Sequence, residues 1–251
     1  MNDFAEIVGR YRDDGFAVVR GVYSPPEISE LGHTIDRCAS DMAGKLGAGD
    51  IYFEDAPGRP MKSMFFLEKH EESLAALLTD PRLLDMARAV YDDAGVVLET
   101  VMCFGKPARS GSVTPPHQDN VFQAWDPPEA MTITIAVDAS TADNGVLICQ
   151  RGSHKAGLLP HRPSGVMGFS QMLIDTPDTA EYPEEEIRMV PGDVFLHSVH
   201  TVHRSGANHT DRSRRQLAIM CRSSRAKVDE ERQAKTQEIL RNLHADNAGR
   251  P

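Results

Sequence analysis

The sequence predicts a mainly β fold, a β-sandwich or barrel with helices added at its beginning. From residue 96 onward, short apolar runs alternate with Gly, Pro, Asn and Asp, as is typical of strands joined by turns. Before residue 96, apolar residues recur mainly at helical spacing. The 251 residues can bury one substantial core, so a single domain over 1–251 is expected. The expected strands cover 96–104, 131–137, 145–149, 193–197 and 216–221.

The segment 1–95 is expected to support the β core with helices and one strand. Apolar residues at helical spacing predict a helix from Phe4 up to Gly15, and the apolar run at 16–19 then predicts a strand. Ser24 followed by two prolines is a start signal for a second helix. Two further helical segments are expected between 68 and 91, the second of them opened by a proline.

The core of the barrel is expected at 96–222. Between Lys155 and Arg188 there are many Pro, Gly and Ser residues and little periodicity, which predicts a long irregular insertion and the best candidate for a lid. The charge pattern near the end of the chain predicts a solvated amphipathic helix at 228–244.

Composition narrows the classes of function. The net charge of −10 repels a phosphate backbone and disfavours general nucleic-acid binding, which leaves a small-molecule substrate as the expected partner. No apolar run is long enough to span a bilayer, so we expect no membrane partner and a cytoplasmic location. The cysteines are too scattered for a zinc ribbon or a redox pair and are expected to be buried thiols: Cys38, Cys103, Cys149 and Cys221.

The sharpest local signal is the segment TPPHQDN at 114–120, in which His117 and Asp119 are two residues apart. On a strand, residues two apart point to the same face, so this imidazole and this carboxylate could bind one metal ion. The signal is weak by itself, because the same pattern also fits a surface pair in a proline-rich turn.

A third ligand has to come from another part of the chain. The segment 192–215 contains four histidines, of which only one is needed. Two imidazoles and one carboxylate form the facial triad that leaves sites open on Fe(II) for a chelating co-substrate and dioxygen. The same ligands also suit other divalent metals, so residue types alone leave the metal open. The four candidates are His197, His200, His203 and His209.

Several segments together resemble the phytanoyl-CoA dioxygenase family of Fe(II)- and 2-oxoglutarate-dependent oxygenases. In that family the second histidine ligand is followed by Asn after five residues and by a basic residue after eleven, a spacing that His203, Asn208 and Arg214 match. The resemblance implies a double-stranded β-helix, a cupin-like jelly-roll barrel. The resemblance covers residues 15–222. The segments that carry it are GFAVVRGVYSPPEI at 15–28, HQD at 117–119, NGVLICQRGSHKAGLLPH at 144–161, PGD at 191–193 and HRSGANHTDRSR at 203–214.

The resemblance also implies the site. His117, Asp119 and His203 would bind Fe(II) and carry catalysis, and Arg214 would anchor 2-oxoglutarate. A planar guanidinium can bind a carboxylate through two parallel hydrogen bonds, which gives Arg214 a physical role. The adjacent Arg215 would point to the opposite face of a strand. The further co-substrate contacts that we expect are Thr132, Thr134 and Ser205.

Other residues near these motifs have two interpretations each. His154, in the family motif GSHK, either turns toward the pocket or is an exposed loop residue. The aromatic and amide side chains after the HQD motif either line a substrate pocket or belong to the core, which we favour for the aromatics. His197 and His200 either support the ligands or are ordinary strand and loop residues, which we favour. The side chains after HQD are Phe122, Gln123 and Trp125.

The reaction that the resemblance implies is hydroxylation of an unactivated C–H bond of a small molecule. It would use Fe(II) as cofactor, consume 2-oxoglutarate and O2, and release succinate and CO2. Related halogenases replace the carboxylate ligand by a small residue, so Asp119 disfavours halogenation. Hydroxylation is the first expectation, and desaturation or ring formation are the alternatives that the same chemistry allows. The alternatives are a cupin-like metal-binding protein or non-oxidative metalloenzyme that does not use 2-oxoglutarate, and a catalytically silent scaffold. The sequence leaves the substrate and the oligomeric state open.

Overall fold

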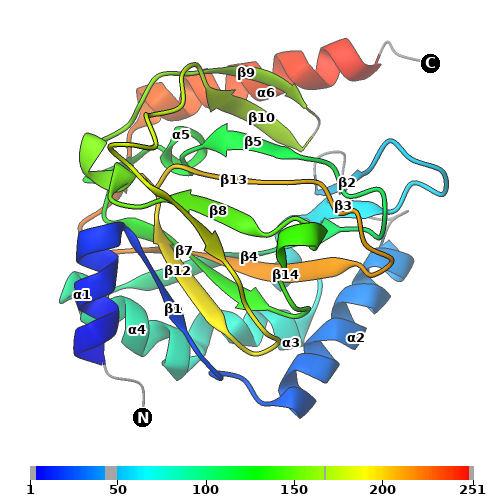
Figure 1. The fold of residues 1–251 in the computed structure, drawn as a ribbon, viewed down its shortest axis with the longest axis horizontal. Helices are drawn as coiled ribbons and strands as arrows, with labels where there is room; N and C mark the ends of the chain where they lie inside the picture. The colour runs from blue at the N-terminus through cyan, green and yellow to red at the C-terminus, as the bar shows by residue number, and fades with distance from the viewer. Residues whose placement is uncertain (1–3, 43–49, 167, 249–251) are drawn as a thin grey trace.

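The computed structural model describes residues 4–42, 50–166 and 168–248. A seven-stranded sheet forms its centre, in the order β1-β12-β7-β14-β4-β3-β2, with every pair antiparallel (Figure 1). Its strands are β1 (Phe16–Val19), β2 (Ile51–Phe53), β3 (Met61–Met64), β4 (Val97–Lys106), β7 (Ala130–Ala136), β12 (Val194–Ser198) and β14 (Arg214–Arg222).

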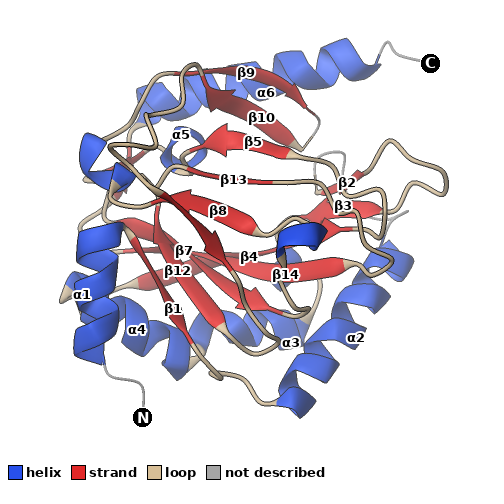
Figure 2. Ribbon diagram, in the orientation of Figure 1, coloured by secondary structure: helices blue, strands red, loops and turns tan. Residues whose placement is uncertain are grey.

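A smaller sheet of four strands, in the order β11-β8-β13-β5, faces the large one across the interior. The hairpin β9–β10 continues beyond β5, and the C-terminal helix α6 runs along that hairpin (Figures 1 and 2). The short pair β6–β15 lies before α6. These elements are β5 (Thr114–His117), β6 (Trp125–Asp126), β8 (Leu147–Gln150), β9 (His161–Val166), β10 (Phe169–Leu173), β11 (Glu184–Ile187), β13 (His203–Ser205), β15 (Lys227–Val228) and α6 (Glu230–Ala248).

Helices cover the outer face of the large sheet (Figure 2). The main core lies between the large sheet and the helices that precede β4 in the chain, and buried residues of these helices pack there, for example Ile7, Ile35 and Leu83. Helix α4 begins as the sequence predicts, with a proline in its first turn and Asp80 capping the free N–H of Arg82. The helices are α1 (Phe4–Asp14), α2 (Pro25–Met42), α3 (Glu72–Ala75), α4 (Pro81–Tyr91) and α5 (Asn120–Gln123), with 3₁₀ turns η1 (Leu67–Lys69), η2 (Ala76–Thr79), η3 (Ala142–Asn144) and η4 (Ser153–Ala156).

Alternation along the central strands gives the large sheet two different faces. On β14, Leu217 and Ile219 face the helices, whereas Gln216 and Ala218 face the interior between the sheets. The same period of two on β7 and β4 puts apolar residues in the core and threonines, an aromatic residue and a lysine toward the interior. The interior between the sheets is therefore a polar-lined space built on an apolar support.

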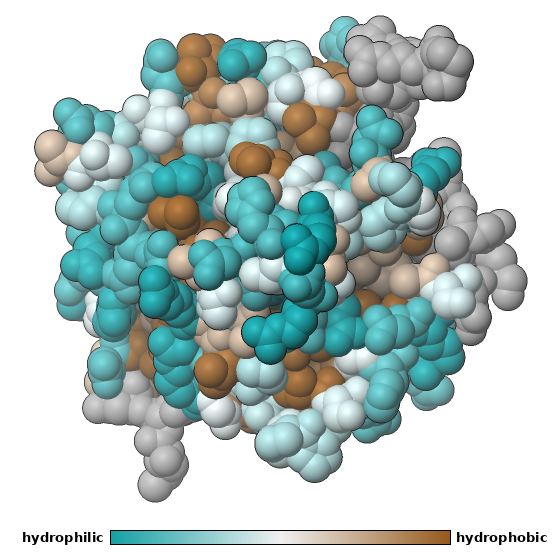
Figure 3. Space-filling view, turned by 45° about the vertical axis from the view of Figure 1, so that its right-hand side comes forward, coloured by the Kyte–Doolittle hydropathy of each residue, from teal (hydrophilic) through white to brown (hydrophobic). Residues whose placement is uncertain are grey.

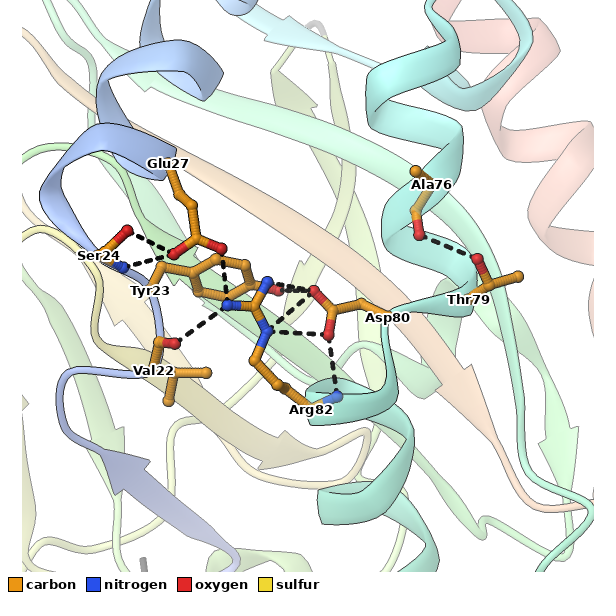
Figure 4. A network of polar contacts seen from close by, with 8 residues as sticks. All are labelled: Val22, Tyr23, Ser24, Glu27, Ala76, Thr79, Asp80 and Arg82. Carbon is orange, nitrogen blue, oxygen red and sulfur yellow. Dashed lines mark hydrogen bonds and ion pairs between the residues drawn. The ribbon is translucent and has the colours of Figure 1, made fainter. Parts of the chain in front are cut away.

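A polar network ties the start of α2 to the start of α4, outside the interior (Figure 4). The Arg82 guanidinium donates to Glu27 and Asp80 at 2.8 and 2.7 Å and lies 4.0 Å from the ring centre of Tyr23. The Tyr23 hydroxyl donates to Asp80 at 2.9 Å. This network orients the N-terminal helices on the sheet and takes no part in the cavity described below.

The strands expected from the sequence are confirmed, and so are the N-terminal helices and the buried free thiols. The segment before residue 96 gives more than support, because β1, β2 and β3 belong to the large sheet. The expected irregular insertion at 155–188 contains the hairpin β9–β10 and strand β11 instead, so that prediction is wrong. Its periodicity is hidden by Pro163, Gly165 and Gly168, the last two of which adopt the positive φ that glycine tolerates.

The fold is a jelly roll, but within the described ranges no strand pairing joins the two sheets into a closed barrel. None of the described helices is long and apolar enough to cross a membrane. The face shown in Figure 3 is largely hydrophilic, with hydrophobic residues in separate small groups. The single domain over 1–251 stays a prediction, and residues 1–3, 43–49, 167 and 249–251 of it lie outside the described residues.

Candidate active site

Two histidines from distant parts of the sequence meet on the small sheet. His117 ends β5 and His203 begins β13, and the two are direct partners in the register of these antiparallel strands. Directly opposed residues point to the same face, so their imidazole rings lie with centres 4.0 Å apart. Strand pairing explains why His203, and not another of the four histidines, lies beside His117.

Asp119 completes the cluster from a turn and not from a strand. It precedes α5 with helical backbone angles, so the prediction of two ligands on one face of a strand is wrong for Asp119. Its Oδ1 lies 3.5 Å from Nε2 of His117 and 3.6 Å from Nε2 of His203. The three ligand atoms all lie within 4.8 Å of one another, which is compatible with binding to one metal ion.

Both histidines are oriented by backbone carbonyls. Nδ1 of His117 lies 2.9 Å from the carbonyl oxygen of Pro115, and Nδ1 of His203 lies 3.0 Å from that of Thr201. A carbonyl can only accept, so Nδ1 carries the proton when the ring is neutral, and Nε2 is then free to bind a metal ion. This arrangement fixes the tautomer that binds a metal through Nε2.

The second oxygen of Asp119 is held by the large sheet. Oδ2 lies 3.0 Å from Nε2 of His197 and accepts from the hydroxyl of Thr132. Burial by itself would raise the pKa of Asp119, but the surrounding imidazoles outweigh it and hold this pKa well below its usual range. The interpretation of His197 as an ordinary strand residue is therefore wrong, because it positions the carboxylate.

A cavity of about 430 Å³ lies between the sheets and contains the three candidate ligands. The predicted co-substrate residues Thr132, Thr134, Ser205 and Arg214 all line it. Thr132 already contacts Asp119, so the structure gives its hydroxyl a position beside the metal candidates. The structure thus brings together every residue that the sequence predicts for metal and co-substrate.

Arg214 lines this cavity and is the first residue of β14. Met220, the partner of Thr132 on the neighbouring strand, lies toward the other end of β14. Arg214 is only 2% exposed, and its guanidinium donates to the carbonyl of Gly145 at 2.6 Å and to the side chain of Gln216. Its Nε and the Nε2 of Gln216 have no hydrogen-bond partner in the described structure. A buried guanidinium whose donors are not all satisfied favours an anion in the cavity beside it.

Lys106, which sequence reasoning missed, is the direct partner of Arg214 on the neighbouring strand β4. It is 5% exposed and lines the same cavity. Burial, together with the charge of Arg214, lowers the pKa of Lys106 to about 7. A Cβ on Gly145 would lie 2.3 Å from the Lys106 side chain, so glycine there leaves room for this second cation.

Asn208 supports these cations from behind. Its amide nitrogen donates to the carbonyls of Lys106 at 2.8 Å and Arg212 at 2.7 Å, and its side-chain oxygen accepts from Thr210. Arg215 points to the other face, as predicted, where Asp138 and Asp36 bind it. Of the two residues that the family spacing places after His203, Asn208 therefore holds the backbone and Arg214 lines the cavity.

The side chains after the HQD motif divide between the two interpretations. Phe122 and Gln123 line the cavity, whereas Trp125 is buried in a separate cluster under the guanidinium of Arg222. The hairpin β9–β10 brings Phe169 to the cavity, with its ring centre 4.3 Å from that of His117. The prediction that these aromatic residues belong to the core is therefore wrong for Phe122 and confirmed for Trp125.

Two more predictions are resolved by the structure. His154 turns away from the cavity and lies 3.1 Å from the carbonyl of Arg12, so that the GSHK segment caps the end of α1. His200 lies 2.9 Å from the amide nitrogen of Asn120 and supports the turn that carries Asp119. Helix α6, expected as a solvated helix, contributes cavity residues that no sequence pattern indicated: Gln233, Thr236, Gln237 and Leu240.

The family model described as phytanoyl-CoA dioxygenase (PhyH) matches residues 11–216. Among similar proteins, a probable alpha-ketoglutarate-dependent hypophosphite dioxygenase of Stutzerimonas stutzeri is 27% identical over 86% of this chain and 77% of its own length. The ectoine dioxygenase of Stutzerimonas stutzeri (strain A1501) is 26% identical over 85% of this chain and 74% of its own length.

Solved structures have the same fold. AviO1 from Streptomyces viridochromogenes Tue57 superposes with a TM-score of 0.70 at 26% identity and covers 90% of this chain and 98% of its own. EctD from S. alaskensis, solved with 2-oxoglutarate and 5-hydroxyectoine, gives a TM-score of 0.72 at 22% identity and covers 87% of this chain and 76% of its own.

Proposed function

The chain belongs to the phytanoyl-CoA dioxygenase family and is a 2-oxoglutarate-dependent non-haem iron dioxygenase; from this premise we propose that it hydroxylates an unactivated C–H bond of a small molecule. The observation that carries the proposal is the cavity that contains both a three-ligand cluster and a buried guanidinium. A metal-binding protein that uses no 2-oxo acid has no need of that guanidinium.

In this proposal His117, Asp119 and His203 bind the iron. Their donor set of two imidazole nitrogens and one carboxylate oxygen fits Fe(II) with open sites for further ligands. His197 and Thr132 hold the free oxygen of Asp119, so that the other oxygen stays directed at the metal position. Bound iron and 2-oxoglutarate would supply the activation of O2, with release of succinate and CO2.

Arg214 binds the distal carboxylate of 2-oxoglutarate. Support comes from its burial, from its unpartnered Nε and from the neighbouring Lys106, because two buried cations favour an anionic ligand between the sheets. Ser205 and Thr134 line the same cavity and offer hydroxyl donors to the co-substrate. In this proposal the oxygenase acts on a small molecule in the cytoplasm and has no nucleic-acid or membrane partner. The acidic net charge supports the absence of a nucleic-acid partner.

The test uses protein loaded with Fe(II) under anaerobic conditions and then given O2 and labelled 2-oxoglutarate. The proposal predicts succinate and CO2 above the level of a His117→Ala control, with further increase when a substrate is present. No turnover above that control with a broad panel of small molecules, combined with tight iron binding, would favour the metal-binding alternative. Absence of both iron and 2-oxoglutarate binding would favour a silent scaffold.

A further inference from the structure

The cavity has two chemically different parts. Its basic residues, within the part of the chain that the structure describes, are Lys62, Lys106 and Arg214. Lys106 and Arg214 are opposed on neighbouring strands, and β3, which carries Lys62, pairs with β4. Glu54 also lines this part and is near enough to both lysines to influence their pKa values. The cations therefore gather around the end of β14 that would hold the co-substrate.

The part beside the candidate metal ligands has another composition. Phe169 and Phe122 lie with ring centres 4.3 and 6.0 Å from that of His117. On the large sheet, Met220 lies beside Thr132, whose hydroxyl donates to Asp119. A substrate C–H that reacts at the metal must lie among these side chains, because the co-substrate extends the other way, toward Arg214.

The wall beyond these apolar side chains is formed by α5 and α6. Gln123 and Gln233 line the cavity, and the described structure gives neither carboxamide a hydrogen-bond partner. Thr236 of α6 donates to the carbonyl of Val121 at 2.8 Å, which fixes α6 against the segment that follows Asp119. The two amides are thus held on a supported wall and are available to a ligand.

We propose, building on the proposed oxygenase function, that the substrate is a neutral molecule with an apolar carbon skeleton against Phe122, Phe169 and Met220 and an uncharged polar group, such as an amide, lactam or hydroxyl, on Gln123 and Gln233. An anionic group at this end would lose its hydration without meeting a cation, which is costly. Carboxamides can both donate to and accept from an uncharged polar group.

The test measures binding of matched probes to the anaerobic protein loaded with Fe(II) and 2-oxoglutarate, by calorimetric titration. The probes are pairs of a carboxamide and the corresponding carboxylate on the same aromatic or alicyclic skeleton, with methylphosphonate as a small anion. We expect the amides to bind at least about tenfold more tightly than their carboxylates. Equal affinity, tighter binding of the anions, or binding of neither series would overturn the proposal.

A pair of variants makes the test specific. Gln233→Lys adds a cation inside the cavity, whereas Ala234→Lys adds the same charge on the neighbouring exposed position of α6. The first variant should reduce the preference for amides by about tenfold and the second should leave it unchanged. The same shift in both variants would mean that a general field, and not the amide wall, sets the preference.

Loading separates this inference from the function on which it rests. Failure to bind Fe(II) or 2-oxoglutarate removes the proposed function, and the substrate inference with it. Normal loading followed by a preference for anions removes only the substrate inference.

Discussion

The two ends of the cavity differ in whether the protein itself provides partners for the side chains that would bind iron and co-substrate. At the metal end each candidate ligand has a protein partner: backbone carbonyls for His117 and His203, and His197 with Thr132 for Asp119. At the other end, Arg214 and Gln216 keep buried donors without acceptors. The protein itself orients the candidate metal ligands, whereas in the proposed function the cationic end is completed by the carboxylate of the co-substrate.

The largest expected effect is at the metal end. Asp119→Ala removes a ligand that both imidazoles face, so we expect loss of high-affinity Fe(II) binding and of 2-oxoglutarate turnover. Metal content after anaerobic loading and dialysis checks this, with His209→Ala, an exposed histidine outside the cavity, as the control. Normal iron content in Asp119→Ala would exclude Asp119 from the ligand set.

The next effect separates the two ends. Arg214→Ala should weaken 2-oxoglutarate binding by about a hundredfold or more, because a charge-assisted pair of hydrogen bonds is lost, and should leave iron content nearly unchanged. Anaerobic titration of 2-oxoglutarate into the Fe(II)-loaded protein measures this. Arg212→Ala, an exposed arginine two residues away, is the matched control. Unchanged affinity in Arg214→Ala would refute the assignment.

A smaller effect is expected for a residue that positions a ligand without being one. His197→Phe keeps an aromatic ring but removes the contact with Oδ2 of Asp119, and we expect iron affinity to fall by about 10- to 100-fold. His197→Gln, whose amide can still donate, should recover part of that loss. Iron affinity measured by competition with a chelator would decide; equal losses in both variants would indicate a packing role only.

The smallest effect is the pH dependence of stability that Lys106 gives the ligand-free protein. Its folded pKa of about 7 lies below the ordinary 10.5, so between these values the unfolded chain holds a proton that the folded one releases. Stability should therefore rise with pH, by up to about 1.4 kcal/mol per pH unit. The slope is best measured from pH 7 up to the ordinary cysteine pKa of 9.0, above which buried thiols act in the opposite direction.

Denaturant unfolding of the wild type and of Lys106→Met at several pH values tests this prediction. The variant has no ammonium to discharge, so its stability should exceed that of the wild type at pH 7, and the difference should shrink as the pH rises. A difference independent of pH would mean that Lys106 keeps its ordinary pKa in the folded protein. The same variant should bind 2-oxoglutarate about tenfold more weakly if both cations share the distal carboxylate.

Five strands of the large sheet, β1, β4, β7, β12 and β14, and the N-terminal helices could be predicted because each has a clear apolar pattern, as in 131–137 and 216–221. The hairpin β9–β10 could not, because glycine and proline interrupt its pattern, and its strands are only partly buried. Strands β2 and β3 in the N-terminal part were not predicted either, because they are too short to show an apolar period.

At the site, the family spacing identified His203 and Arg214, whereas local spacing gave the wrong conformation for Asp119. Lys106 could not be recognised from the sequence, because its position depends on the pairing of strands about a hundred residues apart. His197 was a candidate, but its contact with Asp119 depends on the turn that carries Asp119, which local spacing does not indicate. The cavity side of α6 could not be predicted for a related reason: Gln233 and Gln237 look like ordinary solvated residues until the helix is placed along the hairpin β9–β10.

The decisive experiment for this site is a crystal structure of the protein loaded anaerobically with Fe(II) and 2-oxoglutarate, with the iron located by its anomalous scattering. We expect iron bound by Nε2 of His117, Oδ1 of Asp119 and Nε2 of His203, with the far carboxylate of the co-substrate on the guanidinium of Arg214. Iron held by other side chains, or a co-substrate whose far carboxylate does not reach Arg214, would contradict this expectation.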